Sequence, residues 1–211
     1  MLKKNFNGLG LIFSPFLQGK SHSKKVAYIG LFTAFLIVCN GFFSFPIGDV
    51  QFSITIFASL MAGVILGPMA GFFACFIADL LGYFISSGGL FYYFWVGLST
   101  STFALIAGLL FIKQSQSKSI KCTAIKVTLI ILISFVVCTV IINSTGFYIY
   151  NKNIGFLTSA IEYAKDTFGS EVSFFIYLVY RLIFRGQIFN SLFNYALFII
   201  SLPALKRLKL L

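Results

Sequence analysis

Three charged side chains stand inside apolar stretches of this sequence, and their presence there needs a chemical reason. Asp79 lies near the middle of the apolar run 70–85, and Arg181 and Arg185 lie four residues apart in a run near the C-terminal end. An ionised group in a membrane span costs about 2.5–3.5 kcal/mol on insertion scales, so it is expected to face a partner or a water-filled cavity. Residues four apart on a helix share one face.

Two interpretations of these charges stay open. In the first, Asp79 pairs with an arginine and holds helices together, or the arginines extend to lipid headgroups. In the second, the arginines lie at an outward-facing polar pocket, where one of them meets an anionic or amide-bearing ligand while Asp79 orients the other. The second interpretation makes Asp79, Arg181 and Arg185 candidate substrate-binding residues.

Aromatic and amide side chains add further candidates. Tyr92 and Trp95 belong to a run of five aromatic residues, 91–95, which is typical of a membrane-boundary belt or of a wall that stacks a flat heterocycle. Asn143 lies near the end of a later apolar segment, where its amide has either a helix or a ligand as partner. The candidate substrate-binding residues are therefore Asp79, Tyr92, Trp95, Asn143, Arg181 and Arg185.

A second polar stripe follows the arginines. Gln187, Asn190 and Asn194 recur at three and four residues, and on one continuous helix they point largely away from the arginine face. Buried amides in membranes usually form hydrogen bonds between helices. We therefore expect this stripe to join helices rather than to bind a ligand.

Catalytic machinery is absent from the sequence. The single histidine is His22, no HExxH or P-loop motif occurs, and the four cysteines have no metal-ligand spacing. The sequence predicts no enzyme, no metal site and no cofactor. Active transport, if the chain performs it, must take its energy from partners or from an ion gradient.

Composition indicates an integral membrane protein. Hydrophobic residues make up 59% of the 211 residues and charged residues only 10%, against about 25% charged residues in soluble domains. The net charge of +11 does not suggest nucleic-acid binding, because the basic residues flank apolar spans instead of forming one face. At about 20 residues a span, the chain has room for about six spans.

Apolar segments and their boundaries predict an all-α bundle of six transmembrane helices. Residues 1–24 are expected to form a cytoplasmic N-terminal tail, and residues 25–211 the six-helix substrate-binding domain. The spans are expected at about 26–45, 52–66, 70–85, 93–112, 124–148 and 172–205.

The distribution of basic residues predicts that both termini are cytoplasmic. In that orientation three clusters on the cytoplasmic side hold twelve of the sixteen positive charges, in agreement with the positive-inside bias. Four of the five acidic residues then fall outside. The clusters are Lys3, Lys4, Lys20, Lys24 and Lys25; Lys113, Lys118, Lys121 and Lys126; and Lys206, Arg207 and Lys209.

Two further segments have a recognisable pattern. Phe156, Ala160, Ala164 and Phe168 recur every four residues, which predicts a short helix in the outer connection 149–171. This helix is either a lid over a pocket or an interfacial helix resting on the bilayer. In the first span a stripe of small residues allows another helix to approach closely, inside the bundle or from a partner protein. The stripe consists of Ala27, Gly30 and Ala34.

The stretch 62–82 carries a resemblance to a known family. It contains the turn Gly67-Pro68-Met-Ala-Gly71 and then Asp79-Leu-Leu-Gly82 in the following span. With Gly88-Gly89, the aromatic cluster, the 97–108 span and Tyr180-Arg181-Leu182, the chain resembles the substrate-binding (S) components of energy-coupling-factor (ECF) importers. The resemblance covers about residues 25–205 and is nearest the folate-type branch. The segment 143–148, Asn-Ser-Thr-Gly-Phe-Tyr, departs from the pattern of that branch, which argues against folate itself.

The resemblance implies a function and partners. An S component lies in the cytoplasmic membrane of a prokaryote, captures a vitamin or related micronutrient from outside, and topples in the membrane to release it. It works with a transmembrane coupling subunit and two ATPase subunits. The family implies that Ala27, Gly30 and Ala34 contact the coupling subunit and that the ligand lies near Trp95, Arg181 and Arg185.

The alternative is a small ion-coupled carrier or channel unrelated to ECF systems. Such a carrier is expected to show inverted repeats or discontinuous helices with ion ligands. The two halves of this sequence show no repeat, and only one acid, Asp79, lies within a span.

Overall fold

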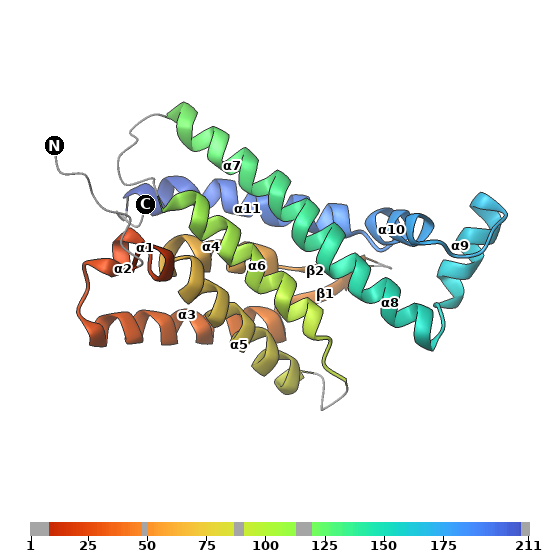
Figure 1. Cartoon of the computed structure of the whole chain (residues 1–211), viewed down its shortest axis with the longest axis horizontal. Coiled ribbons are helices and arrows are strands. Elements are labelled where there is room, and N and C mark those ends of the chain that lie inside the picture. Colours follow the sequence, from red (N-terminus) through yellow and green to blue (C-terminus); the bar gives the residue numbers. More distant parts are fainter. Residues whose placement is uncertain (1–8, 48–49, 87–90, 113–119, 208–211) are drawn as a thin grey trace.

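The computed structural model describes residues 9–47, 50–86, 91–112 and 120–207 as an elongated bundle of helices (Figure 1). Within these residues, five helices are long and apolar enough to cross a membrane, and two shorter apolar helices accompany them. Two very short helices, α1 (Leu9–Ile12) and α2 (Pro15–Gln18), precede the bundle. Its principal elements are α3 (His22–Phe42), α4 (Thr55–Leu66), α5 (Pro68–Ser86), α6 (Phe94–Phe111), α7 (Ile120–Ser134), η2 (Phe135–Ser144), α8 (Thr145–Ile154), α9 (Thr158–Phe168), α10 (Phe174–Ile183) and α11 (Gln187–Arg207).

The helical membrane fold predicted from the sequence is confirmed, with one addition. Residues 44–53, expected to be a turn and the start of the second span, form a short antiparallel hairpin of β1 (Ser44–Ile47) and β2 (Val50–Ser53). Alternating polar and apolar residues before α4 allow this local pairing. The second span is correspondingly shorter than expected, with the 12 residues of α4.

The fifth predicted span is longer than expected. Residues 122–154 form one continuous apolar stretch of 33 residues, made of α7 from Cys122 onward, the π-helical segment η2 and α8. At about 1.5 Å a residue this helix is roughly 50 Å long, against a hydrocarbon thickness of about 30 Å. The excess length carries α8 beyond the other long helices, toward the end of the molecule where α9 lies (Figure 1).

The sixth predicted span, in contrast, is two helices. α10 ends at Ile183 and α11 begins at Gln187, and between them Gly186 has a φ of 66°. Residues other than glycine rarely adopt this left-handed conformation, so the glycine permits the break. The assumption of one helix across 172–205 is wrong at this point. Residues before and after Gly186 therefore do not follow a single helical wheel.

The core lies between α3, α4, α5, α6 and α11, where small residues let the helices pack closely. Ala58, Ala62 and Ala104 are fully buried there. Residues 9–18, which belong to the expected N-terminal tail, pack on this core. Leu17 is fully buried, and the Ser14 backbone N–H donates to the Leu66 carbonyl oxygen at the α4–α5 turn.

Several basic residues of the expected cytoplasmic clusters lie at one end of the long axis. The start of α3, which carries Lys24 and Lys25, and the end of α11, which carries Lys206, are both at this end (Figure 1). The Lys206 Nζ donates to the Thr123 Oγ1 at 3.3 Å, which joins the end of α11 to the start of α7. α9 and the tip of α8 lie at the opposite end.

Candidate functional site

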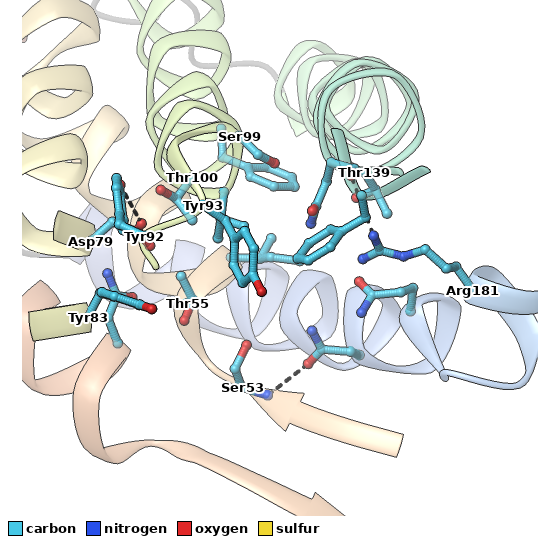
Figure 2. Close-up of a pocket in the computed structure, with 18 residues that line it drawn as sticks. Ser53, Thr55, Asp79, Tyr83, Tyr92, Tyr93, Ser99, Thr100, Thr139 and Arg181 are labelled. Carbon is cyan, nitrogen blue, oxygen red and sulfur yellow. Dashed lines mark hydrogen bonds between the residues drawn. The ribbon is translucent and has the colours of Figure 1, made fainter. Parts of the chain in front are cut away.

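A cavity of about 370 Å³ lies inside the bundle (Figure 2). Its volume is typical of a small-molecule site. Residues from eight helical elements, from the strand β2 and from the segment before α6 contribute to its wall, so it depends on the whole bundle. We call it the inner cavity, and it is lined by Asn40, Ser53, Thr55, Ile56, Asp79, Tyr83, Tyr92, Tyr93, Val96, Ser99, Thr100, Phe103, Thr139, Asn143, Phe147, Arg181, Gln187 and Asn190.

Asp79 and Tyr92 form one side of the inner cavity. The Tyr92 hydroxyl donates to the Asp79 Oδ2 at 2.9 Å, and Asp79 is only 8% exposed. Burial raises the pKa of the Tyr92 phenol and the Asp79 carboxylate raises it further, so Tyr92 remains a donor at neutral pH. Gly97 leaves the space for this hydroxyl, because a Cβ at Gly97 would overlap it. The hydrogen bond partly compensates the cost of burying the carboxylate.

Arg181 forms the opposite side (Figure 2). It is 8% exposed, its Nη1 donates to the Asn143 carbonyl oxygen at 3.4 Å, and its guanidinium carbon lies 4.3 Å from the Phe147 ring centroid. Tyr177 also interacts with it. None of these partners, within the described part of the chain, is a carboxylate. Asp79 therefore does not pair with Arg181, and the interpretation of an ion pair between them does not hold.

Asn190 and Asn194 of α11 connect the cavity floor to β2 and α4. The Ser53 N–H donates to the Asn190 Oδ1 at 3.0 Å, and the Phe57 N–H donates to the Asn194 Oδ1 at 2.8 Å. The second bond satisfies a free amide in the first turn of α4, where Ile54 at the N-cap makes no side-chain hydrogen bond. The prediction that the polar stripe joins helices is confirmed for Asn194, which joins α11 to α4. Asn190 joins α11 to the strand β2 and lines the cavity, and Gln187 lines it as well.

Two buried amide oxygens at the cavity have no hydrogen-bond partner among the described residues. They are the Oδ1 atoms of Asn40 on α3 and of Asn143 on η2. A buried acceptor without a donor costs about 1–3 kcal/mol. These two oxygens are therefore suited to accept N–H or O–H groups of a bound ligand.

The structure brings four of the six candidate residues to the inner cavity: Asp79, Tyr92, Asn143 and Arg181. Trp95 is not among the lining residues. Its ring packs behind them, 5.3 Å from Tyr93 and 5.7 Å from Phe147 between ring centroids. Arg185 is exposed and lines only a neighbouring cavity.

Several lining residues were not predicted as site residues. Asn40, Tyr83, Ser99 and Thr100 lie in apolar segments, and no local pattern distinguishes them from residues that bond within the bundle. Ser99, for example, donates to the Cys138 carbonyl oxygen at 3.0 Å while it lines the cavity. For Ser53 and Thr55 the sequence did contain a signal. Polar residues at the start of the second apolar segment indicate a helix face turned away from lipid.

The neighbouring outer cavity, about 380 Å³, shares Tyr93, Phe147, Arg181 and Gln187 with the inner one. Helix α9, which the four-residue spacing of apolar residues predicted, is confirmed, and it lies next to this cavity. Ala160 and Ala164 are buried, and the Ser159 and Tyr180 hydroxyls lie 2.6 Å apart. The other lining residues are Tyr150, Asn151, Ile154, Leu157, Tyr177, Tyr180 and Arg185.

A helical membrane bundle that encloses a polar and aromatic cavity is typical of the class of membrane-embedded proteins that bind a small molecule. Residues 20–202 match the family model described as ECF-type riboflavin transporter, S component, and the chain belongs to this family. No curated protein sequence matches the chain.

Among solved structures, the crystal structure of FolT bound with folic acid is similar in fold. Its TM-score is 0.52 at 20% sequence identity, and the alignment covers 84% of this chain and 93% of that chain. Identity this low shows the shared fold alone.

Family membership decides between the functions considered from the sequence. The chain is the substrate-binding S component of an ECF-type vitamin importer, a multi-pass protein of the prokaryotic cell membrane. It is a transporter subunit and not an enzyme. The alternative of an ion-coupled carrier unrelated to ECF systems is therefore set aside. The sequence resemblance was nearest the folate-type branch, whereas the matching family model is the riboflavin type.

Proposed function

We propose that the inner cavity binds riboflavin and that the chain passes it to a coupling module. The observation that carries this proposal is the pair of unpartnered amide oxygens of Asn40 and Asn143 in a cavity with an aromatic wall. The flavin ring is flat and has an N–H group flanked by carbonyl oxygens at one edge. Amide side chains match such an edge because they both donate and accept hydrogen bonds.

The aromatic wall suits the faces of the same ring. Tyr93 and Phe147 line the cavity with ring centroids 5.3 Å apart. Hydroxyl groups of Ser99, Thr100 and Thr139 lie around the same space (Figure 2) and are suited to the hydroxylated side chain of riboflavin. In this arrangement Asp79 holds Tyr92 in place, and Arg181 and Asn143 contact the ligand.

The ligand enters from outside in this proposal, with both termini in the cytoplasm. Support comes from the basic residues at the end of the bundle formed by the start of α3 and the end of α11, as the positive-inside bias requires. The strand β2 and the starts of α4, α6 and α11, which contribute residues to the cavity wall, then belong to the outer half. The proposal also gives α9, whose Ser159 hydroxyl lies 2.6 Å from that of Tyr180, the role of a lid on this side.

In this proposal the chain delivers its ligand through a transmembrane coupling subunit and two ATPase subunits, as the ECF family implies. The sequence itself contains no nucleotide-binding motif. The docking surface in this proposal is the exposed face of α3, which points away from the bundle. Ala27, Gly30 and Ala34 are all exposed, and a Cβ at Gly30 would meet no atom within 4 Å. A groove of small residues lets a partner helix approach closely.

Ligand identity is tested by purifying the protein in detergent and identifying the co-purified small molecule by mass spectrometry. We expect riboflavin, and we expect added riboflavin to lose fluorescence on binding because its ring stacks on aromatic side chains. Folate serves as the comparison ligand. Co-purification of a different vitamin, with no change in riboflavin fluorescence, would contradict the riboflavin assignment while leaving the family unchanged.

A further inference from the structure

The N-terminal residues 9–18 are fixed on the end of the bundle instead of extending away from it. The Ser14 N–H donates to the Leu66 carbonyl oxygen at 2.9 Å, and the Leu17 side chain is fully buried. This carbonyl oxygen belongs to the last turn of α4, where a helix leaves acceptors without an intrahelical partner. Gly67 follows it, and a Cβ there would overlap the Ser14 backbone. The segment therefore has a set orientation relative to the helices.

This segment lies at a membrane boundary. Helix α3, which follows it, has 21 residues. At about 1.5 Å a residue it is about 31 Å long, close to the hydrocarbon thickness of about 30 Å. Because α3 begins at His22, the residues just before it lie where the hydrocarbon meets the headgroups. The Phe16 and Tyr28 rings are in contact, 5.2 Å apart between centroids, so α2 lies beside the first turns of α3 (Figure 1).

Exposed apolar side chains occur on α1. Leu11 and Ile12 are 41% and 43% exposed, although the segment is held on the core by Ser14 and Leu17. Apolar side chains at a membrane boundary are stabilised by the acyl chains just below the headgroups. Leu11 and Ile12 are suited to that layer.

The charges of this part of the chain are all positive. The Lys20 Nζ lies 4.9 Å from the Phe16 ring centroid. The Lys25 Nζ lies 5.1 Å from the Phe13 ring centroid. These contacts hold both ammonium groups close to the segment. The sequence contains no Asp or Glu in residues 1–48, so no acid from this part of the chain neutralises them.

We propose that residues 9–25 form a binding surface for anionic phospholipids of the leaflet at this end of the bundle. The two exposed apolar side chains of α1 enter the acyl region, and Lys20, Lys24 and Lys25 contact the phosphate-bearing headgroups. Charge complementarity selects the lipid, because lysines beside apolar residues at a membrane surface attract anionic headgroups. This surface is separate from both cavities, so the proposal does not depend on which ligand they bind.

The test uses a bimane label on Ile12→Cys in a Cys122→Ser background, since the other three cysteines are buried. The full-length protein is reconstituted in nanodiscs of equal parts phosphatidylglycerol and phosphatidylcholine, with bromine on the acyl chains of one lipid or the other. Bromine quenches the label on contact, so the two quenching values give the relative affinity of the two lipids for this surface. We expect stronger quenching by brominated phosphatidylglycerol.

Removal of two lysines should weaken this preference. In Lys24→Gln/Lys25→Gln we expect the relative affinity for phosphatidylglycerol to fall about fivefold for each lysine removed. Lys152→Gln/Lys165→Gln is the matched control. It removes two exposed positive charges from α8 and α9, at the opposite end of the molecule (Figure 1), and should leave the preference unchanged.

Three outcomes would overturn the proposal. Equal quenching by the two lipids in the labelled protein with all its lysines would show apolar contact without recognition of charge. No quenching by either lipid would show that the segment does not touch the bilayer, and would leave a partner protein as the occupant of this surface. An equal fall in both double variants would show a response to net charge and not to the lysines beside α1.

Discussion

Arg181 is a buried cation whose described partners are a carbonyl oxygen, an aromatic face and a tyrosine. These groups orient the guanidinium but do not neutralise it. Lysine would not replace it well, because the planar group both stacks on Phe147 and donates in a fixed direction. The side chain is thus held ready for a ligand atom at the boundary of the two cavities.

Replacement of Arg181 by Gln should weaken ligand binding. Loss of a hydrogen bond to a charged group costs about 1.5–3 kcal/mol, or roughly 10- to 150-fold in affinity. Titration of the detergent-solubilised protein measures the change, and Arg207→Gln, at the exposed end of α11, is the control for net charge. Wild-type affinity in both Arg181→Gln and Arg185→Gln would show that the arginines only anchor the bundle.

Tyr92→Phe should destabilise the protein, because it leaves the buried Asp79 carboxylate without the donor at 2.9 Å. An unsatisfied buried group of this kind costs about 1–3 kcal/mol, which should lower the thermal denaturation temperature. Tyr28→Phe is a suitable control, since the Tyr28 contact with Phe16 is between rings. Equal denaturation temperatures for Tyr92→Phe and Tyr28→Phe would contradict this role of Tyr92.

At the scale of elements, two irregularities shape the site. The break at Gly186 separates α10 from α11, so that Arg181 and Gln187 both reach the cavities. The π-helical segment η2 supplies Thr139 and Asn143 to the inner cavity, and the Ser144 hydroxyl donates to the Thr139 carbonyl oxygen five residues earlier. Such π-helical turns are frequent at functional sites.

Gly186→Ala should cost stability and affinity together. A left-handed conformation costs about 1–2 kcal/mol for an ordinary residue, and relief of that strain would move α10, with Arg181, relative to α11. Asn tolerates the conformation better than Ala, so Gly186→Asn should be milder. Gly19→Ala is the control, since Gly19 has a φ of −78° and open space around its Cβ position. Equal behaviour of Gly186→Ala and Gly19→Ala would show that the break does not depend on the glycine.

At the scale of the whole molecule, the exposed face of α3 and the cavities are separate surfaces. Ala27, Gly30 and Ala34 are exposed along α3, and none of them lines either cavity. Ligand capture by the isolated protein and docking to a partner should therefore be separable by mutation.

Gly30→Leu or Ala34→Leu should reduce vitamin uptake by cells without reducing ligand binding by the purified protein, because the larger side chain fills the groove on α3. Ala196→Leu, an equal change at an exposed position of α11, should leave uptake intact. Normal uptake in the α3 variants would contradict docking through this face. Loss of ligand binding would show instead that the stripe supports the bundle.

Much of the fold and part of the site follow from local patterns. The helices α3, α5 and α6 lie close to the expected spans, and α9 was expected from Ala160 and Ala164. Asp79 and Arg181 were identifiable as site residues because a charge in an apolar run needs a partner or a cavity. Trp95 could not be placed in the same way, because an aromatic ring is equally stable on a cavity wall and behind it.

The sequence by itself determined the membrane class, the order of the long helices and the family resemblance. Hydropathy, charge clusters and the Gly67-Pro68 turn depend only on the order of residues along the chain. Only the tertiary structure decided which side chains share a cavity. The reason is that a regular helical wheel fails wherever a helix breaks or widens, as at Gly186 and in η2. Likewise the pairing of Asp79 with Tyr92, rather than with an arginine, depends on how α5 packs against α6.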